Sequence, residues 1–204
     1  MKCLKITMLL QLILMLNMAA NAQQGQFRAD LNYTVGLPFG NLKNLSEKTS
    51  WRGGEIAFMY GLTDKASIGL QIGMQDFYQK FPRTVIHQSG TDISAVVSNS
   101  IQVMPILLKG SMNLKQMGAV LPYVSLAAGG NFIQYRKFYG EFTDSRYTFG
   151  FAAQPSVGVH IPFGRTNAVA FHLAAGYNFM PFSYNDADGL SHGVIKAGIS
   201  VPLQ

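Results

Sequence analysis

The sequence predicts an all-β fold: an eight-stranded antiparallel up-and-down transmembrane β-barrel. Only 13% of the 204 residues are charged, against about 25% in soluble domains, so something other than water must face much of the chain. Segments that alternate large apolar and small residues recur, which is the period of strands with two unlike faces. Beyond residue 22 no apolar run reaches the roughly 20 residues of a spanning helix. A closed barrel is the other structure that satisfies every backbone group in lipid.

Residues 1–22 have the layout of an export signal peptide, so we exclude them from the fold. Lys2 and Lys5 form the basic end, Ile6–Met18 is the apolar run, and Ala20-Asn21-Ala22 supplies the small residues of a cleavage site. A run of about 13 residues is shorter than a membrane-spanning helix. We expect cleavage before Gln23 and one domain over residues 23–204.

The cysteine and charge content exclude several classes of protein. The single cysteine, Cys3, lies in the signal segment, so the mature chain is expected to use neither disulfides nor an acylated cysteine. Without Lys2 and Lys5, the 16 basic residues fall to 14 against 10 acidic ones, a mild net charge of +4, and no stretch of five or more basic residues occurs. We therefore expect no nucleic-acid partner.

The first four strands are predicted by alternation. In Phe27–Leu37, large apolar residues alternate with polar ones, and the same rule covers Ile56–Leu62 and Ser67–Gln75. Ile101–Asn113 switches parity around Pro105. Because proline cannot donate to the strand ladder, we expect a β-bulge or a bend there.

The last four strands follow the same rule. They cover Tyr123–Tyr135, Tyr147–Pro162, Ala168–Phe179 and His192–Leu203. Tyr147–Pro162 is the clearest, because every second residue from Tyr147 is apolar and the residues between are glycine, alanine, serine, threonine, glutamine and histidine. Side chains two apart share a face, so each of these strands has one large apolar face and one small, weakly polar face.

The connections alternate in length. The long ones cover Pro38–Arg52, Tyr78–Ser100, Arg136–Arg146 and Pro181–Ser191, and the short ones cover Thr63–Ala66, Lys115–Leu121 and Phe163–Asn167. Outer-membrane barrels have short periplasmic turns and longer outer loops. We therefore expect periplasmic termini, four outer loops and a location in the cell outer membrane.

A soluble eight-stranded barrel of lipocalin type is the alternative fold. Its outer face meets water and should carry many lysines and glutamates. Here the apolar face carries no charge, which suits lipid, where an arginine or lysine at the midplane costs about 2–4 kcal/mol. The small opposite face suits a narrow lumen filled by side chains, so an open pore is not expected.

Three stretches carry a resemblance to a known family: Tyr33-Thr-Val-Gly-Leu-Pro-Phe-Gly40, Leu121-Pro-Tyr-Val-Ser-Leu-Ala-Ala-Gly-Gly130 and Lys196-Ala-Gly-Ile-Ser-Val-Pro-Leu203. With them, residues 23–204 resemble the small outer-membrane β-barrel domain family, whose relatives include OmpA and OmpX-type barrels. The resemblance implies two partners, outer-membrane lipid and the barrel assembly machinery. Many such barrels end in an aromatic residue, whereas this chain ends Pro202-Leu203-Gln204.

Five charges fall on the inward parity of the strands: Arg28, Asp30, Glu55, Lys109 and Lys196. An unpaired buried charge is costly, so we expect them to pair in a structural polar network. A gated proton or ion path through the network is the alternative. Because the first and last strands must meet when the barrel closes, we expect Asp30 to pair with Lys196.

Two pairs of residues could carry further chemistry. His160 and His172 face the lumen from adjacent strands, and we expect a shared hydrogen-bond network there, with no metal site. His87 and Ser89, two apart in the second outer loop, could act as base and nucleophile. Their spacing resembles the His-x-Ser element of outer-membrane lipid A deacylases.

Aromatic residues cluster toward the strand ends. We expect them to form interfacial girdles, because amphipathic rings favour the headgroup zone. They are Trp51, Tyr60, Phe77, Tyr78, Phe81, Tyr123, Tyr135, Phe138, Tyr139, Tyr147, Phe179 and Phe182. A possible extracellular ligand would be held by the outer loops, above all the second, because loops that long are usually functional or disordered.

These observations favour a non-enzymatic outer-membrane barrel with a polar, side-chain-filled lumen. Its outer loops would serve surface contact or membrane integrity. No catalytic residue, cofactor or metal is expected. The alternatives are a lipid-modifying enzyme that is lipid A deacylase-like and a passage for small apolar molecules.

Overall fold

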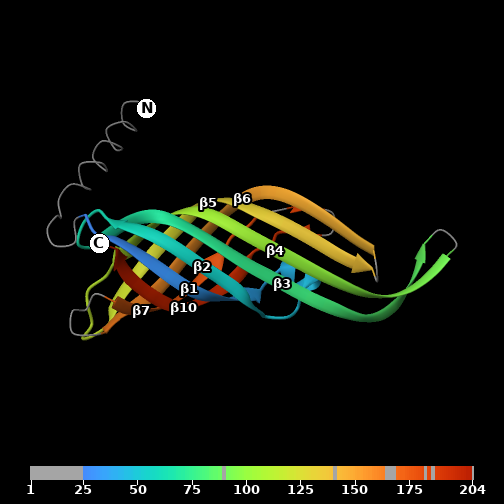
Figure 1. The fold of residues 1–204 in the computed structure, drawn as a ribbon, viewed down its shortest axis with the longest axis horizontal. Coiled ribbons are helices and arrows are strands. Elements are labelled where there is room, and N and C mark those ends of the chain that lie inside the picture. Colours follow the sequence, from blue (N-terminus) through green and yellow to red (C-terminus); the bar gives the residue numbers. More distant parts are fainter. Residues whose placement is uncertain are drawn as a thin grey trace, which may run out of the picture.

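The computed structural model describes residues 25–88, 91–139, 142–163, 169–181, 183–184 and 187–203, and it confirms the predicted fold class. The main sheet is a closed antiparallel barrel in the order β1-β10-β7-β6-β5-β4-β3-β2 (Figure 1). Its strands are β1 (Phe27–Pro38), β2 (Ser50–Gly61), β3 (Ala66–Gln88), β4 (Thr91–Asn113), β5 (Leu121–Tyr139), β6 (Phe142–Phe163), β7 (Val169–Asn178) and β10 (His192–Leu203). The predicted signal peptide lies outside the described residues.

The barrel closes between its first and last strands, as predicted. β1 pairs with β10 from Phe27 opposite Leu203 to Pro38 opposite His192. The stagger of the strands can be read by following the paired residues from strand to strand around the barrel, starting at Leu31. In one direction the pairs reach β6 at Phe151, and in the other they reach β6 at Ile161. The two positions lie on the same strand ten residues apart. This stagger tilts the strands and decides which residues meet inside.

β3, β4, β5 and β6 are longer than the sequence predicts. The predicted second loop, Tyr78–Ser100, is wrong, because β3 and β4 stay paired to Gln88 opposite Thr91. The third, Arg136–Arg146, is also wrong, because β5 and β6 pair to Tyr139 opposite Phe142. Alternation fails as a signal there, since a strand beyond the lipid has no apolar solvent to face. The β3–β4 hairpin projects well beyond the other strands (Figure 1).

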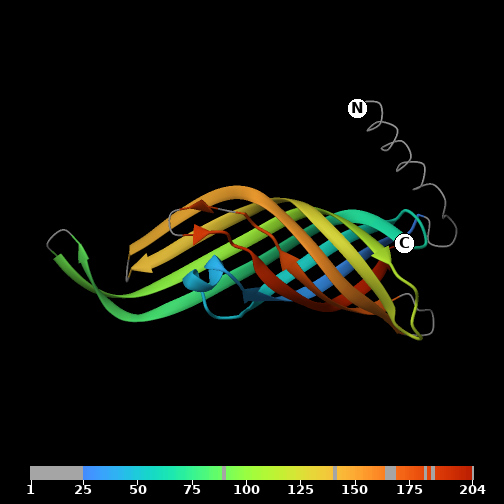
Figure 2. The same ribbon diagram turned by 180° about the vertical axis from the view of Figure 1, so that it is seen from behind.

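The first and fourth outer connections contain short elements that the sequence did not predict. Helix α2 (Asn41–Leu45) follows β1, and the hairpin β8 (Ser183–Tyr184) and β9 (Ala187–Asp188) precedes β10. α2 lies beside β9 (Figure 2). Among the described residues, no helix is long and apolar enough to cross a membrane.

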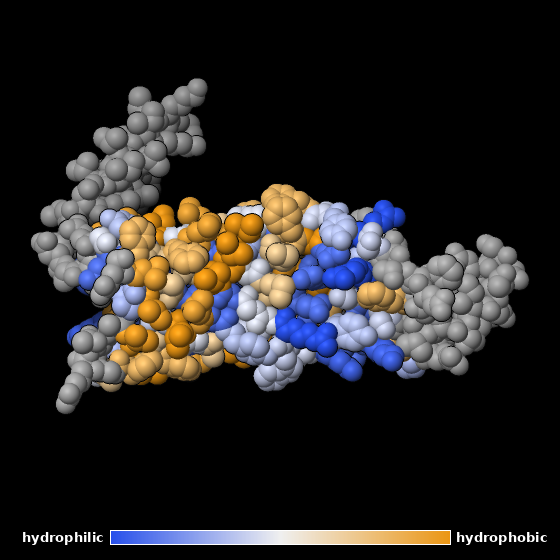
Figure 3. Space-filling view, in the orientation of Figure 1, coloured by the Kyte–Doolittle hydropathy of each residue, from blue (hydrophilic) through white to orange (hydrophobic). Residues whose placement is uncertain are grey.

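The outward face of the strands is apolar over a continuous belt. On β3 it runs through Ile68, Leu70, Ile72 and Met74, all at least a third exposed. The belt lies toward the end that holds Phe27 and Leu203, and a polar surface follows beyond it (Figure 3). Exposed apolar side chains on this scale exclude the soluble alternative, because a lipocalin-type barrel presents its polar face to water.

The bulge expected at Pro105 is absent. β4 keeps one register with β5 through Pro105, which lies opposite Asn131. The apparent parity switch arises instead because Ile101 and Val103 are buried in the lumen. Register shifts occur elsewhere, between Thr34 and Gly36 on β1 and between Lys80 and Arg83 on β3.

Close contact between strands makes the Gly69 position sensitive to a single methyl group. A Cβ there would overlap the Phe58 carbonyl oxygen and lie 2.8 Å from the Met59 Cα, whereas at Gly54 the nearest atom would be 3.8 Å away. We expect Gly69→Ala to lower the free energy of unfolding by about 1–3 kcal/mol, as overpacking does. Gly54→Ala, the control, should change it by less than about 0.5 kcal/mol. Urea unfolding in lipid vesicles, followed by electrophoretic mobility without boiling, measures both; equal effects would contradict the contact.

Candidate functional site

The lumen holds all five of the predicted inward charges. Asp30, Glu55, Lys109 and Lys196 are buried, and the Arg28 side chain is 21% exposed at the end where β1 begins. The parity rule therefore identified the residues of the site correctly.

The charges pair differently from the prediction. The Lys196 Nζ lies 2.6 Å from Glu55 Oε2 and also donates to the Gln154 Oε1 at 2.6 Å. Asp30 forms an ion pair with Arg28, in which the Asp30 Oδ1 lies 3.3 Å from the Arg28 Nε. The same carboxylate oxygen accepts a hydrogen bond from the Ser200 Oγ at 2.6 Å.

The expected pair of Asp30 with Lys196 is therefore wrong. β1 and β10 are neighbours, but Asp30 lies opposite Ser200 and Lys196 lies opposite Thr34. Four residues along a strand separate these levels by about 13 Å. Closure of the barrel predicts that β1 and β10 are neighbours. The height of each residue along the barrel depends in addition on the register between the two strands.

A chain of amides extends from the Lys196 pair toward the outer end of the lumen. Gln71 Nε2 donates to the Gln154 Oε1 at 2.6 Å, and Gln154 in turn donates to Asn178. Asn178 Nδ2 and His192 Nε2 are 2.8 Å apart. These residues come from β3, β6, β7 and β10, so the network ties opposite walls of the barrel together.

Nearer the end where β1 begins, His160 and His172 form a second cluster. Their rings stack with centroids 4.9 Å apart, and the two residues are directly paired on β6 and β7. His172 also bonds the Tyr123 hydroxyl and, at 2.5 Å, the Asn32 Oδ1. The expected network is confirmed for His172 alone, because His160 joins the cluster by ring stacking and its buried Nε2 has no hydrogen-bond partner among the described residues. No group of potential metal ligands occurs among the described residues.

The outer end of the lumen is closed by an apolar cluster that the sequence did not predict. We call it the outer plug; its buried members are Leu42, Phe77, Ile101, Val103, Leu107, Ala127, Ile133, Ala152, Met180 and Leu190. Leu42 comes from α2, while Met180 and Leu190 come from the fourth outer connection, so two outer segments fold into the barrel. The sequence signal for this cluster is the inward parity of the apolar residues Ile101 and Val103.

Backbone and side-chain bonds hold the fourth connection inside. The Leu190 N–H donates to the Met180 carbonyl at 3.1 Å, and Phe179 pairs with Ala153 of β6. The His192 Nδ1 lies 3.0 Å from the Leu190 carbonyl oxygen, so its N–H can donate there. The ring of Phe77 stands edge-on to His192, with centroids 4.9 Å apart. The plug therefore rests directly on the top of the polar network.

Polar and apolar layers in series define what the lumen can do. Arg28 with Asp30 and Lys196 with Glu55 form ion pairs, Lys109 is buried, and the layer above them is mainly hydrocarbon, in which the buried Asn131 amide donates to the Met180 sulfur. Moving an ion through such a layer is expensive, because nothing there replaces its water. The arrangement supports the structural interpretation of the network over the alternative of an ion path.

The girdle prediction is correct for some aromatics and wrong for others. Trp51, Tyr60, Tyr78, Tyr147 and Phe179 are exposed on the outside. Phe77 and Tyr123 are instead buried in the lumen, and Tyr135 packs against the outer plug. These three have the inward parity of their strands. For these residues, strand parity is a better predictor of position than closeness to a strand end.

The candidate catalytic pair cannot be placed. The backbone of His87 belongs to β3, opposite Asp92, but its side chain and all of Ser89 lie outside the described residues. The same holds for the side chains of Tyr139 and Phe182.

No known family model matches the chain, and no curated protein matches it. Among solved structures, it is similar to Neisserial surface protein A (NspA), with a TM-score of 0.55, 12% identity, and coverage of 86% of this chain and 95% of that one. The N-terminal β-barrel domain of Pseudomonas aeruginosa OprF gives a TM-score of 0.48 and 11% identity over 88% and 98% of the chains. The Escherichia coli outer membrane protein W gives 0.48 and 15% over 90% and 100%.

The first of these similarities shows the fold. The chain has the architecture of the small outer-membrane barrels, as the resemblance to OmpA and OmpX-type barrels implied. Together with the apolar belt, it supports the predicted location in the outer membrane.

The Lys196–Glu55 pair offers a direct test of the lumen network. Glu55→Gln leaves the buried Lys196 ammonium without its carboxylate, so we expect the free energy of unfolding to fall by about 3–5 kcal/mol. The double variant Glu55→Gln/Lys196→Met removes both charges and should recover most of that loss. Urea unfolding in vesicles measures each, with Glu47→Gln at the exposed Glu47 as the neutral control. Full stability of the single variant would show that the ion pair does not support the fold.

Proposed function

We propose that this chain is a non-enzymatic outer-membrane barrel with a closed lumen, and that it makes contacts at the cell surface through a projecting β-sheet. The observation that carries the proposal is the length of β3 and β4 beyond the apolar belt. The belt on β3 ends at Met74, yet the strand continues to Gln88. At about 3.3 Å per residue, that extension reaches roughly 45 Å along the strand.

The projecting part is a sheet of four strands, β3 to β6, whose two edges have no strand partner among the described residues. β3 pairs with β2 only as far as Gln75. β6 pairs with β7 only as far as Ser156, followed by the single bridge at Ala153. A strand edge presents a row of backbone donors and acceptors, which is a ready surface for another chain. Such a sheet suits contact with a partner better than transport.

The closed lumen supports the same proposal. For the alternative of a passage for small apolar molecules, the outer plug would have to move, and its Leu42, Met180 and Leu190 are almost completely buried. The barrel itself contacts outer-membrane lipid through its belt. Export by the signal peptide and insertion by the barrel assembly machinery complete the proposal.

Shortening the projecting hairpin tests surface contact against membrane integrity. Lys80 and Ser98 are paired, so residues 81–97 can be replaced by an Asn-Gly turn that fits a two-residue hairpin. We expect cells with this variant to adhere to each other and to surfaces no better than cells without the protein, because the contact sheet is lost. Their sensitivity to detergent and to large antibiotics should stay that of the parent.

The variant must first be shown to fold, by its change in electrophoretic mobility on boiling. Unchanged adhesion would contradict the contact role. Unchanged adhesion together with higher antibiotic sensitivity would instead favour membrane integrity.

The enzymatic alternative makes a separate prediction. If Ser89 is not a nucleophile, Ser89→Ala leaves lipid A acylation unchanged in mass spectra of cells that express the protein. The control is a strain without the gene, which should give the same spectrum. Loss of a deacylated species only in the variant and the null strain would establish the deacylase-like role.

A further inference from the structure

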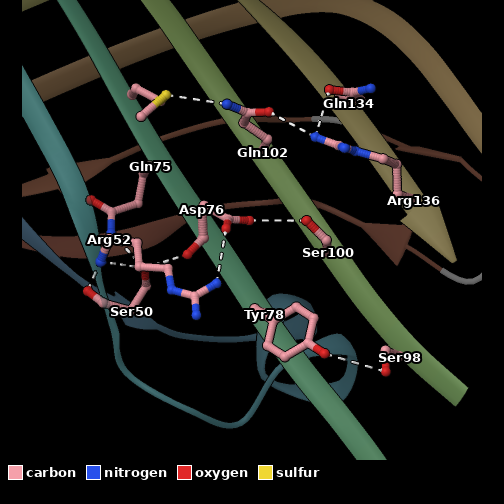
Figure 4. Close-up of polar contacts among 11 residues, drawn as sticks. Ser50, Arg52, Gln75, Asp76, Tyr78, Ser98, Ser100, Gln102, Gln134 and Arg136 are labelled. Carbon is pink, nitrogen blue, oxygen red and sulfur yellow. Dashed lines mark hydrogen bonds and ion pairs between the residues drawn. The ribbon is translucent and has the colours of Figure 1, made fainter. Parts of the chain in front are cut away.

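A cluster of polar side chains lies on the outward face of the barrel. We call it the outer-face patch; it consists of Arg52, Asp76, Tyr78, Ser98, Ser100, Gln102, Gln134 and Arg136 (Figure 4). It extends over β2, β3, β4 and β5. None of its residues takes part in the lumen network or the outer plug described above.

The patch begins at the upper edge of the apolar belt. Asp76 lies opposite Gln102, and Gln102 lies opposite Gln134, which places these three in one row across the sheet. Two residues below, on the same face, are the exposed apolar residues Met74, Met104 and Phe132. A tilted strand needs roughly 9–11 residues to cross the hydrocarbon core of the membrane. The segment of β3 from Ala66 to Gln75 has this length. The patch therefore lies at headgroup level on the outer side.

The two arginines of the patch are held in place by their neighbours. Arg136 Nη2 donates to the side-chain oxygens of Gln102 and Gln134, each at 3.2 Å. Arg52 lies 3.6 Å from Asp76 Oδ2 and 5.4 Å from the centre of the Tyr78 ring. Guanidinium groups that are already ordered lose less side-chain entropy when they bind an anion.

The charge and spacing of the patch favour an anionic partner of some length. Asp76 is the single carboxylate beside two guanidinium groups, and its other oxygen accepts a bond from Ser100 Oγ at 3.0 Å. Lys80 continues the same face, opposite Ser98. Arg52 and Arg136 lie on strands three spacings apart, or about 14 Å along the sheet. Hydroxyl and amide groups fill the space between them, which suits a sugar.

We propose that the outer-face patch binds the headgroup of a phosphorylated glycolipid of the outer leaflet. Each guanidinium pairs with a phosphate, for which its planar fork of donors is well suited. The hydroxyl and amide groups between bind the sugar, and the acyl chains lie along Met74, Met104 and Phe132. A free phosphate would contact only the two guanidinium groups, whereas a lipid also covers the apolar belt beneath them. The inference rests on the membrane position of the barrel and is independent of the surface-contact role.

The test compares lipid binding by the folded protein and its variants. Detergent-solubilised protein is mixed with diphosphorylated lipid A, its dephosphorylated form or phosphatidylcholine, and adducts are counted by native mass spectrometry. We expect a lipid A adduct, and dissociation constants about tenfold weaker for the other two lipids, since hydrogen bonds between charged groups are lost. Arg52→Gln/Arg136→Gln should weaken lipid A binding by about the same factor.

The matched control is Lys65→Gln/Lys115→Gln, which removes two exposed charges at the opposite end of the barrel. All variants must show the parent's heat-dependent mobility. Equal lipid A binding by the arginine variant and the control variant would overturn the proposal. Complete displacement of lipid A by an equal concentration of inorganic phosphate would also overturn it, because the site would then recognise phosphate without the lipid. Failure of these tests would leave the adhesion experiment above unaffected.

Discussion

The requirement that every backbone N–H and C=O be hydrogen-bonded in lipid governs this structure. It forces β1 onto β10 and so gives each strand an outer face toward hydrocarbon and an inner face toward seven other strands. The outer face has one solution, a belt of large apolar side chains. The inner face is narrow and must bury whatever polarity it holds. Closure therefore creates both the belt and the lumen, and the charges of the lumen then have to find partners among themselves.

How those partners are chosen follows from the stagger. Because neighbouring strands slide past one another around the ring, residues that share a parity need not share a level. Lys196 of β10 reaches past β1 to Glu55 of β2, while Asp30 meets Arg28 of its own strand. A buried ion pair gains little over an apolar pair of similar size, but it penalises every register in which the charges are separated. The network thereby favours one register between the strands of the closed barrel. Small alternating side chains such as glycine and alanine would specify that register only weakly.

The same physics separates what could be predicted from the sequence from what could not. Strands in contact with lipid, such as the segment Tyr147–Pro162, follow a strict alternation, and the inward parity of Asp30 and Lys196 follows from the same alternation. Their pairing did not, because the register is a property of the whole ring. Beyond the bilayer the alternation ceases to identify strands, so Tyr78–Gln88 resembled a loop. The outer plug went unrecognised because Leu42 and Leu190 fold back from connections whose path no local pattern specifies.

The outward-facing residues of the strands change from apolar to polar at the place where the membrane ends. On β3 the outward residues pass from Met74 to Asp76 and Tyr78, and on β4 from Met104 to Gln102 and Ser100. Both changes occur at the same level although the strands run in opposite directions, so the boundary belongs to the surroundings and not to either strand.

Inside the barrel, the order is reversed: apolar Phe77 and Ile101 lie at this level, and the charges lie below it. Toward the end where β1 begins, the wall is mostly polar inside and apolar outside. The outer plug begins inside the belt, at Leu107, and continues to Phe77 and Ile101, where the outer face becomes polar. The barrel thus buries apolar surface against lipid below and against the folded-in outer segments above, which explains how a sheet can continue past the membrane without losing its core.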